Sequence, residues 1–118
     1  MTKHESLPYL KHIIDAIKDI GSFTKGLTKI QFLKNKLRQS AVIRQLEIIG
    51  EASKNLPANF RERHGEVEWK RIAGTRDKII HHYFGIDLNT VWDIVKNDLP
   101  ELKRKIKSIL EEKSADKK

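Results

Sequence analysis

The chain has 118 residues, enough for one hydrophobic core and too few for two. It has no cysteine, which excludes disulfides and thiolate metal sites, and its apolar runs are far too short to span a membrane. A formal net charge of +8, from 24 Lys and Arg against 16 Asp and Glu, favours polyanionic partners. The sequence opens without the apolar core of a secretion signal, so we expect a cytoplasmic protein.

Apolar spacing predicts helices in the first half of the chain. A first helix over 7–20 can end at Gly21, and a turn over 26–28, with Thr28 as N-cap, then precedes a short helix over 30–33. A third helix over 42–56 is expected to stop there, because Pro57 disfavours helical geometry in the residue before it.

The second half follows the same pattern. Residues 58–67 are expected to form a polar connection that contains about one turn of helix, and the next helix is expected over 68–83. Asp87 is a suitable N-cap for a further helix, and a last segment restarts over 98–110. No run of strict apolar alternation predicts a strand.

These elements predict an all-α fold, an antiparallel bundle of about five to six helices. One domain is expected over 1–113, followed by a flexible basic tail over 114–118. Gly50 and Gly74 lie inside predicted helices, where each costs about 1 kcal/mol relative to alanine, so each is expected to permit a close approach. For both glycines, a close crossing of two helices is one explanation. For Gly74, a second explanation is room for a phosphate backbone beside Arg76.

Arg76 interrupts the apolar face of the helix predicted over 68–83. The other positions of that face recur at helical spacing and are Trp69, Ile72, Ala73, Ile79, Ile80 and Tyr83. Arginine keeps its charge, and burying it unpaired is costly, so Arg76 needs an anionic partner, a wet cleft or a subunit interface. The alternative is that it reaches solvent along its aliphatic stem.

The same helix carries His81 and Tyr83. At about 100° per residue, Tyr83 lies within roughly 20° of Arg76, whereas His81 is turned roughly 140° away. The side chains can converge if the helix ends near His81, as Gly85 indicates, or if a second copy of the chain closes the site across a two-fold axis.

The pattern Arg76, four residues, His81, one residue, Tyr83 resembles the R-x4-H-x-Y signature of HepT-like toxins in the HEPN superfamily. The similarity covers most of residues 5–112, since the family's other blocks are matched in order by 43–52, 69–76 and 84–92.

Two residues depart from the family pattern. Asp77 stands where Asn is common, and His82 stands where an acidic or small residue is common. Because the superfamily allows four to six residues between Arg and His, His82 competes for the catalytic role. We prefer His81, which alone keeps the spacing to Tyr83.

The residue types suit RNA cleavage without a metal. Such cleavage needs a group for the 2′-hydroxyl proton, an acid for the leaving 5′-oxygen and a cation for the phosphate. Histidine exchanges protons near neutral pH, as His81 would, and the planar fork of Arg76 matches phosphate oxygens. The resemblance implies a metal-independent endoribonuclease toxin of a type II/VII-like toxin–antitoxin system, a homodimer with both motifs in one groove, and 2′,3′-cyclic phosphate products. No cofactor is expected.

The resemblance also implies a partner, a minimal nucleotidyltransferase antitoxin that adenylylates the tyrosine of the motif, Tyr83. An O-AMP group there would add bulk and negative charge where RNA passes. The residue types leave other roles open for Tyr83: contact with a phosphate, stacking on a base, or a core aromatic ring with its hydroxyl at the rim.

Asp77, His82 and Glu47 are candidate supporting or substrate-binding residues. Glu47 and Glu51 lie one helical turn apart and either form a carboxylate pair near the site or face solvent beside Arg44 or Lys54. A metal site is not expected, because metal-ligand spacing is absent among the histidines, His4, His12, His64, His81 and His82.

Two other classes of function remain open. One is a non-catalytic HEPN subunit that binds a nucleotide or substrate for a nucleotidyltransferase. The other is a basic helical protein that holds nucleic acid without cutting it. RNA cleavage that is lost on Arg76→Ala would separate the enzyme from both.

Overall fold

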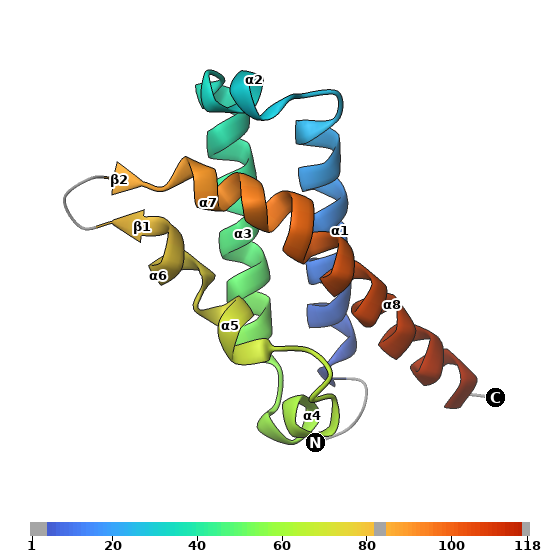
Figure 1. Ribbon diagram of the computed structural model, residues 1–118. Coiled ribbons are helices and arrows are strands. Elements are labelled where there is room, and N and C mark those ends of the chain that lie inside the picture. The colour runs from blue at the N-terminus through green and yellow to red at the C-terminus, as the bar shows by residue number, and fades with distance from the viewer. Residues whose placement is uncertain (1–4, 82–84, 117–118) are drawn as a thin grey trace.

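The computed structural model describes residues 5–81 and 85–116 and is almost entirely helical (Figure 1). The helices are α1 (Leu7–Thr24), α2 (Lys29–Leu33), α3 (Lys36–Asn55), α4 (Ala58–Arg63), α5 (Trp69–Ala73), α6 (Thr75–Ile79), α7 (Leu88–Asp93), the π-helical segment η2 (Ile94–Asp98) and α8 (Leu99–Asp116). Strands β1 (Ile80–His81) and β2 (Gly85–Ile86) form an antiparallel hairpin between α6 and α7. The predicted all-α bundle is confirmed.

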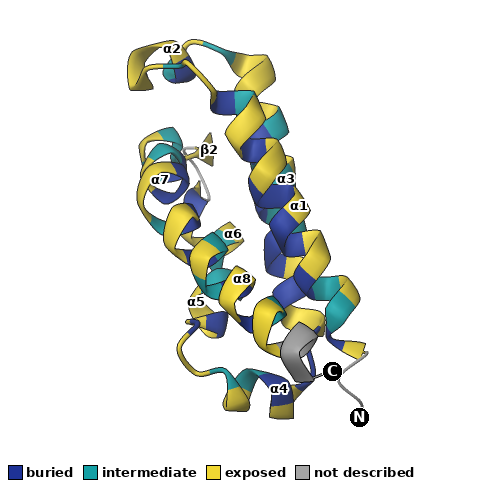
Figure 2. Ribbon diagram, turned by 90° about the vertical axis from the view of Figure 1, so that its right-hand side faces the viewer, coloured by how far each residue is buried: buried dark blue, intermediate teal, exposed yellow. Residues whose placement is uncertain are grey.

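Two layers of helix enclose the core. The antiparallel pair α1 and α3 forms one layer, and the continuous run α7, η2 and α8 crosses it (Figure 1). Their apolar stripes face inward, as the dark blue segments of Figure 2 show, and the most completely buried side chains include Leu10, Ile13, Phe32, Val42, Val91 and Ile106. The short helices α5 and α6 pack on α3 beside this core.

Side-chain caps predicted from the sequence fix several helix ends. The Thr28 hydroxyl accepts a hydrogen bond from Gln31 N at 3.2 Å, and the Asp87 carboxylate accepts one from Thr90 N at 3.1 Å. The chain is extended at Leu56, with ψ at 139°, directly before Pro57. These boundaries follow from local chemistry, which explains why the sequence predicts them.

Three predicted helix boundaries are wrong. α3 begins at Lys36 and not at residue 42, since the Asn35 side chain caps it by accepting a hydrogen bond from Arg38 N at 3.0 Å. α1 continues through Gly21 to Thr24, whose hydroxyl donates a hydrogen bond to the Ile20 carbonyl at 2.8 Å. The last segment does not restart after a break, because η2 joins α7 to α8 without interruption. Pro100 lacks an N–H for the usual α-helical bond, and the ladder shifts to π spacing just ahead of it.

The single helix predicted over 68–83 is also wrong. α5 ends at Ala73, Gly74 adopts φ −87° and ψ 4°, and α6 ends at Ile79. The chain then enters β1, where the prediction had no strand. Strands of two residues are too short to show alternation, so periodicity could not reveal this hairpin.

The predicted boundary between a domain over 1–113 and a tail over 114–118 stays a prediction. α8 runs as far as Asp116, and residues 117–118 lie outside the described part of the chain. Within the described ranges, no helix combines the length and apolar character that crossing a membrane requires.

Candidate functional site

The motif segment is held in place by Ile79 at the end of α6. Its side chain is 1% exposed, and its carbonyl accepts a hydrogen bond of 2.7 Å from Asp87 N. At the start of α6, Lys78 N donates to the Gly74 carbonyl at 3.2 Å. Both ends of this five-residue helix are therefore tied to neighbouring backbone, which positions Arg76 between them.

Arg76 is exposed on α6, and among the described residues its guanidinium has no hydrogen bond or ion pair. The break at Gly74 takes it off the continuous apolar face that the sequence predicted. Of that face, Trp69 and Ile79 are buried, while Ile80 is 38% exposed. No anionic partner within the described chain satisfies Arg76, so its charge is available to an external anion or a second subunit.

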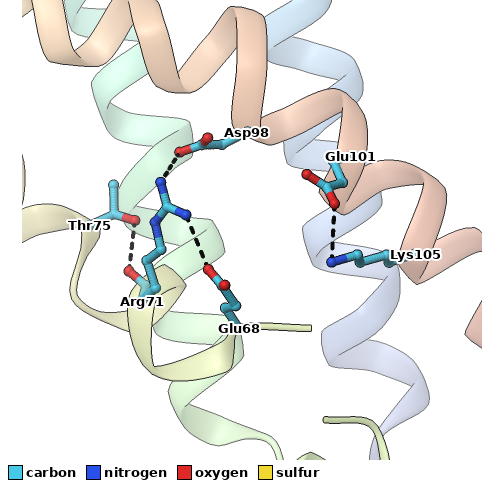
Figure 3. A network of polar contacts seen from close by, with 6 residues as sticks. All are labelled: Glu68, Arg71, Thr75, Asp98, Glu101 and Lys105. Carbon is cyan, nitrogen blue, oxygen red and sulfur yellow. Dashed lines mark hydrogen bonds and ion pairs between the residues drawn. The ribbon is translucent and has the colours of Figure 1, made fainter. Parts of the chain in front are cut away.

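Arg71, five residues earlier, is the opposite case (Figure 3). Its guanidinium contacts Glu68 Oε2 at 3.1 Å and Asp98 Oδ2 at 3.3 Å. The hydrogen bond that Arg71 donates to Glu68, followed by the charge of Asp98, raises the pKa of Arg71 above its ordinary value. This bridge between α5 and η2 was not predicted from the sequence, although the i, i+3 spacing of Glu68 and Arg71 was a usable signal.

A small cavity of about 130 Å³ lies beneath the Arg71 bridge. Its apolar floor includes Leu46, Ile49 and Leu102, and its rim mixes both signs of charge. On that rim Lys105 contacts Glu101 at 3.3 Å (Figure 3). The charges around this cavity are largely matched within the chain.

The backbone of His81 lies in β1, paired with Gly85 of β2. Gly85 has φ of +78°, a conformation that glycine adopts without strain, and this supports the tight reversal between the strands. α6 thus ends two residues before His81. An end of the helix near His81 was one of the two arrangements that would let His81 and Arg76 converge. The described structure gives the His81 backbone only, and His82 and Tyr83 lie outside the described residues.

The hairpin presents apolar side chains to solvent beside the motif. Ile80 and Ile86 are cross-strand partners and are 38% and 40% exposed. Two partly exposed isoleucines directly opposite each other form a small apolar patch beside the motif.

The other candidate residues lie on α3 and α6. Glu47 is half-buried on α3, and Asp77 is exposed in the first turn of α6. Glu51 is exposed, and neither Glu47 nor Glu51 forms an ion pair with a described residue. A role for Glu47 near the site stays a prediction.

Gly50 serves the helix crossing that the sequence predicted. A Cβ built on it would lie 3.5 Å from the Ile72 carbonyl oxygen and 3.7 Å from that of Ala73. The end of α5 therefore rests directly on the backbone of α3. Gly74 has a different role, since it separates α5 from α6. Among the described residues no three His, Asp or Glu side chains gather in a way that would hold a metal ion.

Comparison with known proteins gives a match to the family described as Ribonuclease HepT-like over residues 13–109. The chain is 47% identical over 107 residues to the "Probable ribonuclease HepT" of Thermococcus cleftensis, covering 91% of this chain and 97% of that protein. It is 45% identical over 104 residues to a "Putative RNase" of Caldanaerobacter subterraneus, covering 88% and 93%. No solved structure gives a significant match.

A relative in Methanocaldococcus jannaschii is longer. It is named "Gamma-glutamylcyclotransferase and putative RNase", is 49% identical over 104 residues, and is matched over 47% of its length by 88% of this chain. The chain therefore spans about half of that relative and nearly the whole of the two others. The family match and these identities over most of the sequence show that the chain belongs to the HepT-like ribonuclease family.

Proposed function

We propose that this chain is a metal-independent endoribonuclease in which Arg76 and His81 act on the scissile phosphate. The observation that carries the proposal is the free guanidinium of Arg76, exposed on α6 and without a carboxylate partner among the described residues. Relatives whose names include ribonuclease support the same activity. RNA offers Arg76 the anion that residues 5–81 and 85–116 do not supply.

The chemistry follows from the residue types. A histidine removes the proton of the 2′-hydroxyl, the 2′-oxygen attacks phosphorus, and the bond from phosphorus to the 5′-oxygen breaks. The 5′-oxygen takes a proton from an acid, and a 2′,3′-cyclic phosphate remains. Arg76 stabilises the extra negative charge that develops on the phosphate oxygens in the transition state.

A homodimer completes the site in this proposal. One turnover needs a base and an acid, and a two-fold axis beside α6 and the 43–52 segment of α3 would supply His81 twice. The exposed pair Ile80 and Ile86 and the unpaired Glu47 support an interface on this side. Light scattering should give about twice the chain mass, and a monomer that cleaves RNA would exclude the composite groove.

We further propose that the enzyme is a toxin acting in the cytoplasm, and that its antitoxin is a minimal nucleotidyltransferase that adenylylates Tyr83. AMP on the phenol would bring phosphate charge to Arg76 and repel RNA. Co-expression with that enzyme should add the mass of AMP at Tyr83, and Tyr83→Phe should escape both modification and silencing. If the antitoxin inhibits Tyr83→Phe as fully as the parent chain, it acts by binding the toxin and covering its site, without modification.

The activity itself is tested with purified protein on total cellular RNA in the presence of EDTA. We expect cleavage that yields cyclic phosphate ends. Activity that returns only with magnesium, or products with 5′-phosphates, would exclude the mechanism. A folded dimer that binds RNA and never cuts it would instead identify a non-catalytic binding subunit.

A further inference from the structure

A second feature of the surface lies away from the motif, in an open hollow of about 530 Å³ between the end of α1 and the start of α8. Four lysines line it: Lys18, Lys25, Lys96 and Lys103. No carboxylate and no residue of α6 or of the hairpin belongs to the described lining. The hollow is therefore a concentrated positive surface, separate from the candidate catalytic residues.

These lysines are not neutralised within the described chain, where none of the four forms an ion pair. Lys105, two residues after Lys103 on α8 and outside the lining, shows the contrast, since it contacts Glu101 at 3.3 Å. The ammonium of Lys96 lies 4.6 Å from the centre of the Trp92 ring, which holds it in place without cancelling its charge. Cations grouped around one hollow repel one another, and a bound polyanion relieves that repulsion.

Gly21 leaves bare helix backbone between two of these lysines. Nothing lies within 4 Å of a Cβ built on Gly21, so helix packing does not require glycine there. Lys18 and Lys25 are seven residues apart, two turns or roughly 10 Å along α1, and lie on one side of it. The glycine gives an extended chain room to approach the backbone between the two cations.

The apolar residues of the lining are covered. Ile17, Ile20, Val95 and Leu99 are each no more than 7% exposed. A protein partner usually finds an apolar centre at its interface, and this hollow offers cations instead. The described lining also contains no aromatic ring on which a base could stack.

We propose that the lysine hollow binds the phosphodiester backbone of RNA at nucleotides remote from the scissile phosphate. The proposal rests on the proposed ribonuclease function for the identity of the polyanion. Contacts from lysine to phosphate carry no base information, so the hollow adds affinity for longer RNA strands without selecting their sequence.

The test measures binding of a fluorescent, fully 2′-O-methylated RNA of about 16 nucleotides, which has no 2′-hydroxyl to react. The variant Lys18→Ala/Lys103→Ala removes one cation from each side of the hollow. Its control is Lys36→Ala/Lys54→Ala, which makes the same change in net charge at two exposed lysines outside the lining. Circular dichroism checks that both variants fold.

We expect the hollow variant to bind about tenfold more weakly and to lower the slope of log K against log salt by about 1.4, the value for two phosphate contacts on a single strand. The control should bind within about twofold of the parent chain. Equal losses in both variants, or none in the hollow variant, would overturn the proposal. The proposal would also be overturned if the hollow variant bound RNA normally but no longer bound a polyglutamate peptide, since that result indicates an acidic protein partner.

A second variant tests the shape of the hollow without changing its charge. Gly21→Leu should fold, because the site is open, and should weaken RNA binding several-fold by blocking approach to the backbone. Binding equal to that of the parent chain would contradict the proposed path. If the chain binds RNA through the hollow but cuts none, the ribonuclease proposal alone fails; if it cuts RNA and the lysine variants bind normally, only this inference fails.

Discussion

Two arginines five residues apart distinguish a structural region of this chain from its candidate catalytic region. Arg71 on α5 is engaged by two carboxylates and ties α5 to η2. Arg76 on α6 is exposed and has no such partner among the described residues. Both side chains carry a permanent charge, so the difference lies in what the surrounding fold provides.

The comparison shows which of the two arginines is free to bind an external anion. A cation that already has its counter-ions contributes to the fold, and an added phosphate would have to displace them. A cation left free on a short, well-anchored helix has no intramolecular use that the described chain reveals. We therefore assign Arg71 to the stability of the fold and propose Arg76 for binding the substrate.

The largest expected effect separates the two arginines in a cleavage assay. Arg76→Ala should lower the rate of RNA cleavage at least about a hundredfold, since it removes the charge that stabilises the reacting phosphate. Its free energy of unfolding should change by less than about 0.5 kcal/mol, as expected for an exposed side chain without partners. Rates are measured on one RNA, and stability by urea denaturation. If Arg76→Ala and Arg71→Ala lowered the cleavage rate equally, the distinction between the two regions would be wrong.

The next effect concerns the two histidines of the hairpin region. His81→Ala should also lower cleavage about a hundredfold, the scale for losing a general acid or base, whereas His82→Ala should cost only a few-fold. Both variants should remain folded dimers by light scattering. An inactive His82→Ala protein beside an active His81→Ala protein would transfer the catalytic role to His82.

Arg71→Ala should lower stability and leave cleavage nearly unchanged, the converse of what Arg76→Ala should do. We expect only a small loss in unfolding free energy, because the bridge to Glu68 and Asp98 is largely exposed to solvent, which screens it. Cleavage should stay within about threefold of the parent rate. The loss of stability should shrink in 1 M salt, which screens exposed pairs. A stable but inactive Arg71→Ala protein would place this arginine in the substrate site.

The smallest effect is expected at Gly74, the boundary between the two regions. Its backbone angles are open to alanine, and an added Cβ would lie 3.4 Å from the nearest atom, the Lys70 carbonyl oxygen. Gly74→Ala should therefore change unfolding free energy by less than about 1 kcal/mol and cleavage by less than about threefold. A drop in cleavage beyond tenfold at unchanged stability would show instead that RNA approaches the bare backbone there.

Much of the fold follows from short-range signals in the sequence. Thr28, Asp87 and Pro57 mark helix boundaries through their own side-chain or ring chemistry, and apolar stripes identify the long helices. The break at Gly74 and the hairpin escaped prediction because they depend on tertiary contacts. Ile79 is anchored in the core, and the short strands form around that anchor.

The candidate site was predictable in composition but not in geometry. The interrupted apolar face and the resemblance to HepT-like proteins select Arg76 and His81 as candidates, and an end of the helix near His81 was one of two geometries that the sequence left open. The partners of Arg71 include Asp98, 27 residues further along the chain, which no local pattern reveals. The four lysines of the hollow likewise come from two segments that meet only in the folded chain.

The central claim is that the region with the free arginine cleaves RNA through its 2′-hydroxyl. It is tested most directly by cleavage, in EDTA, of two oligonucleotides that differ by a single 2′-deoxy substitution at the scissile nucleotide. We expect the all-ribose strand to be cut to a 2′,3′-cyclic phosphate, the substituted strand to stay intact at that position, and Arg76→Ala to cut the all-ribose strand at least about a hundredfold more slowly. Cleavage of the substituted strand at the same bond, or cleavage of the all-ribose strand by Arg76→Ala at the parent rate, would contradict attack by the 2′-hydroxyl with Arg76 on the phosphate.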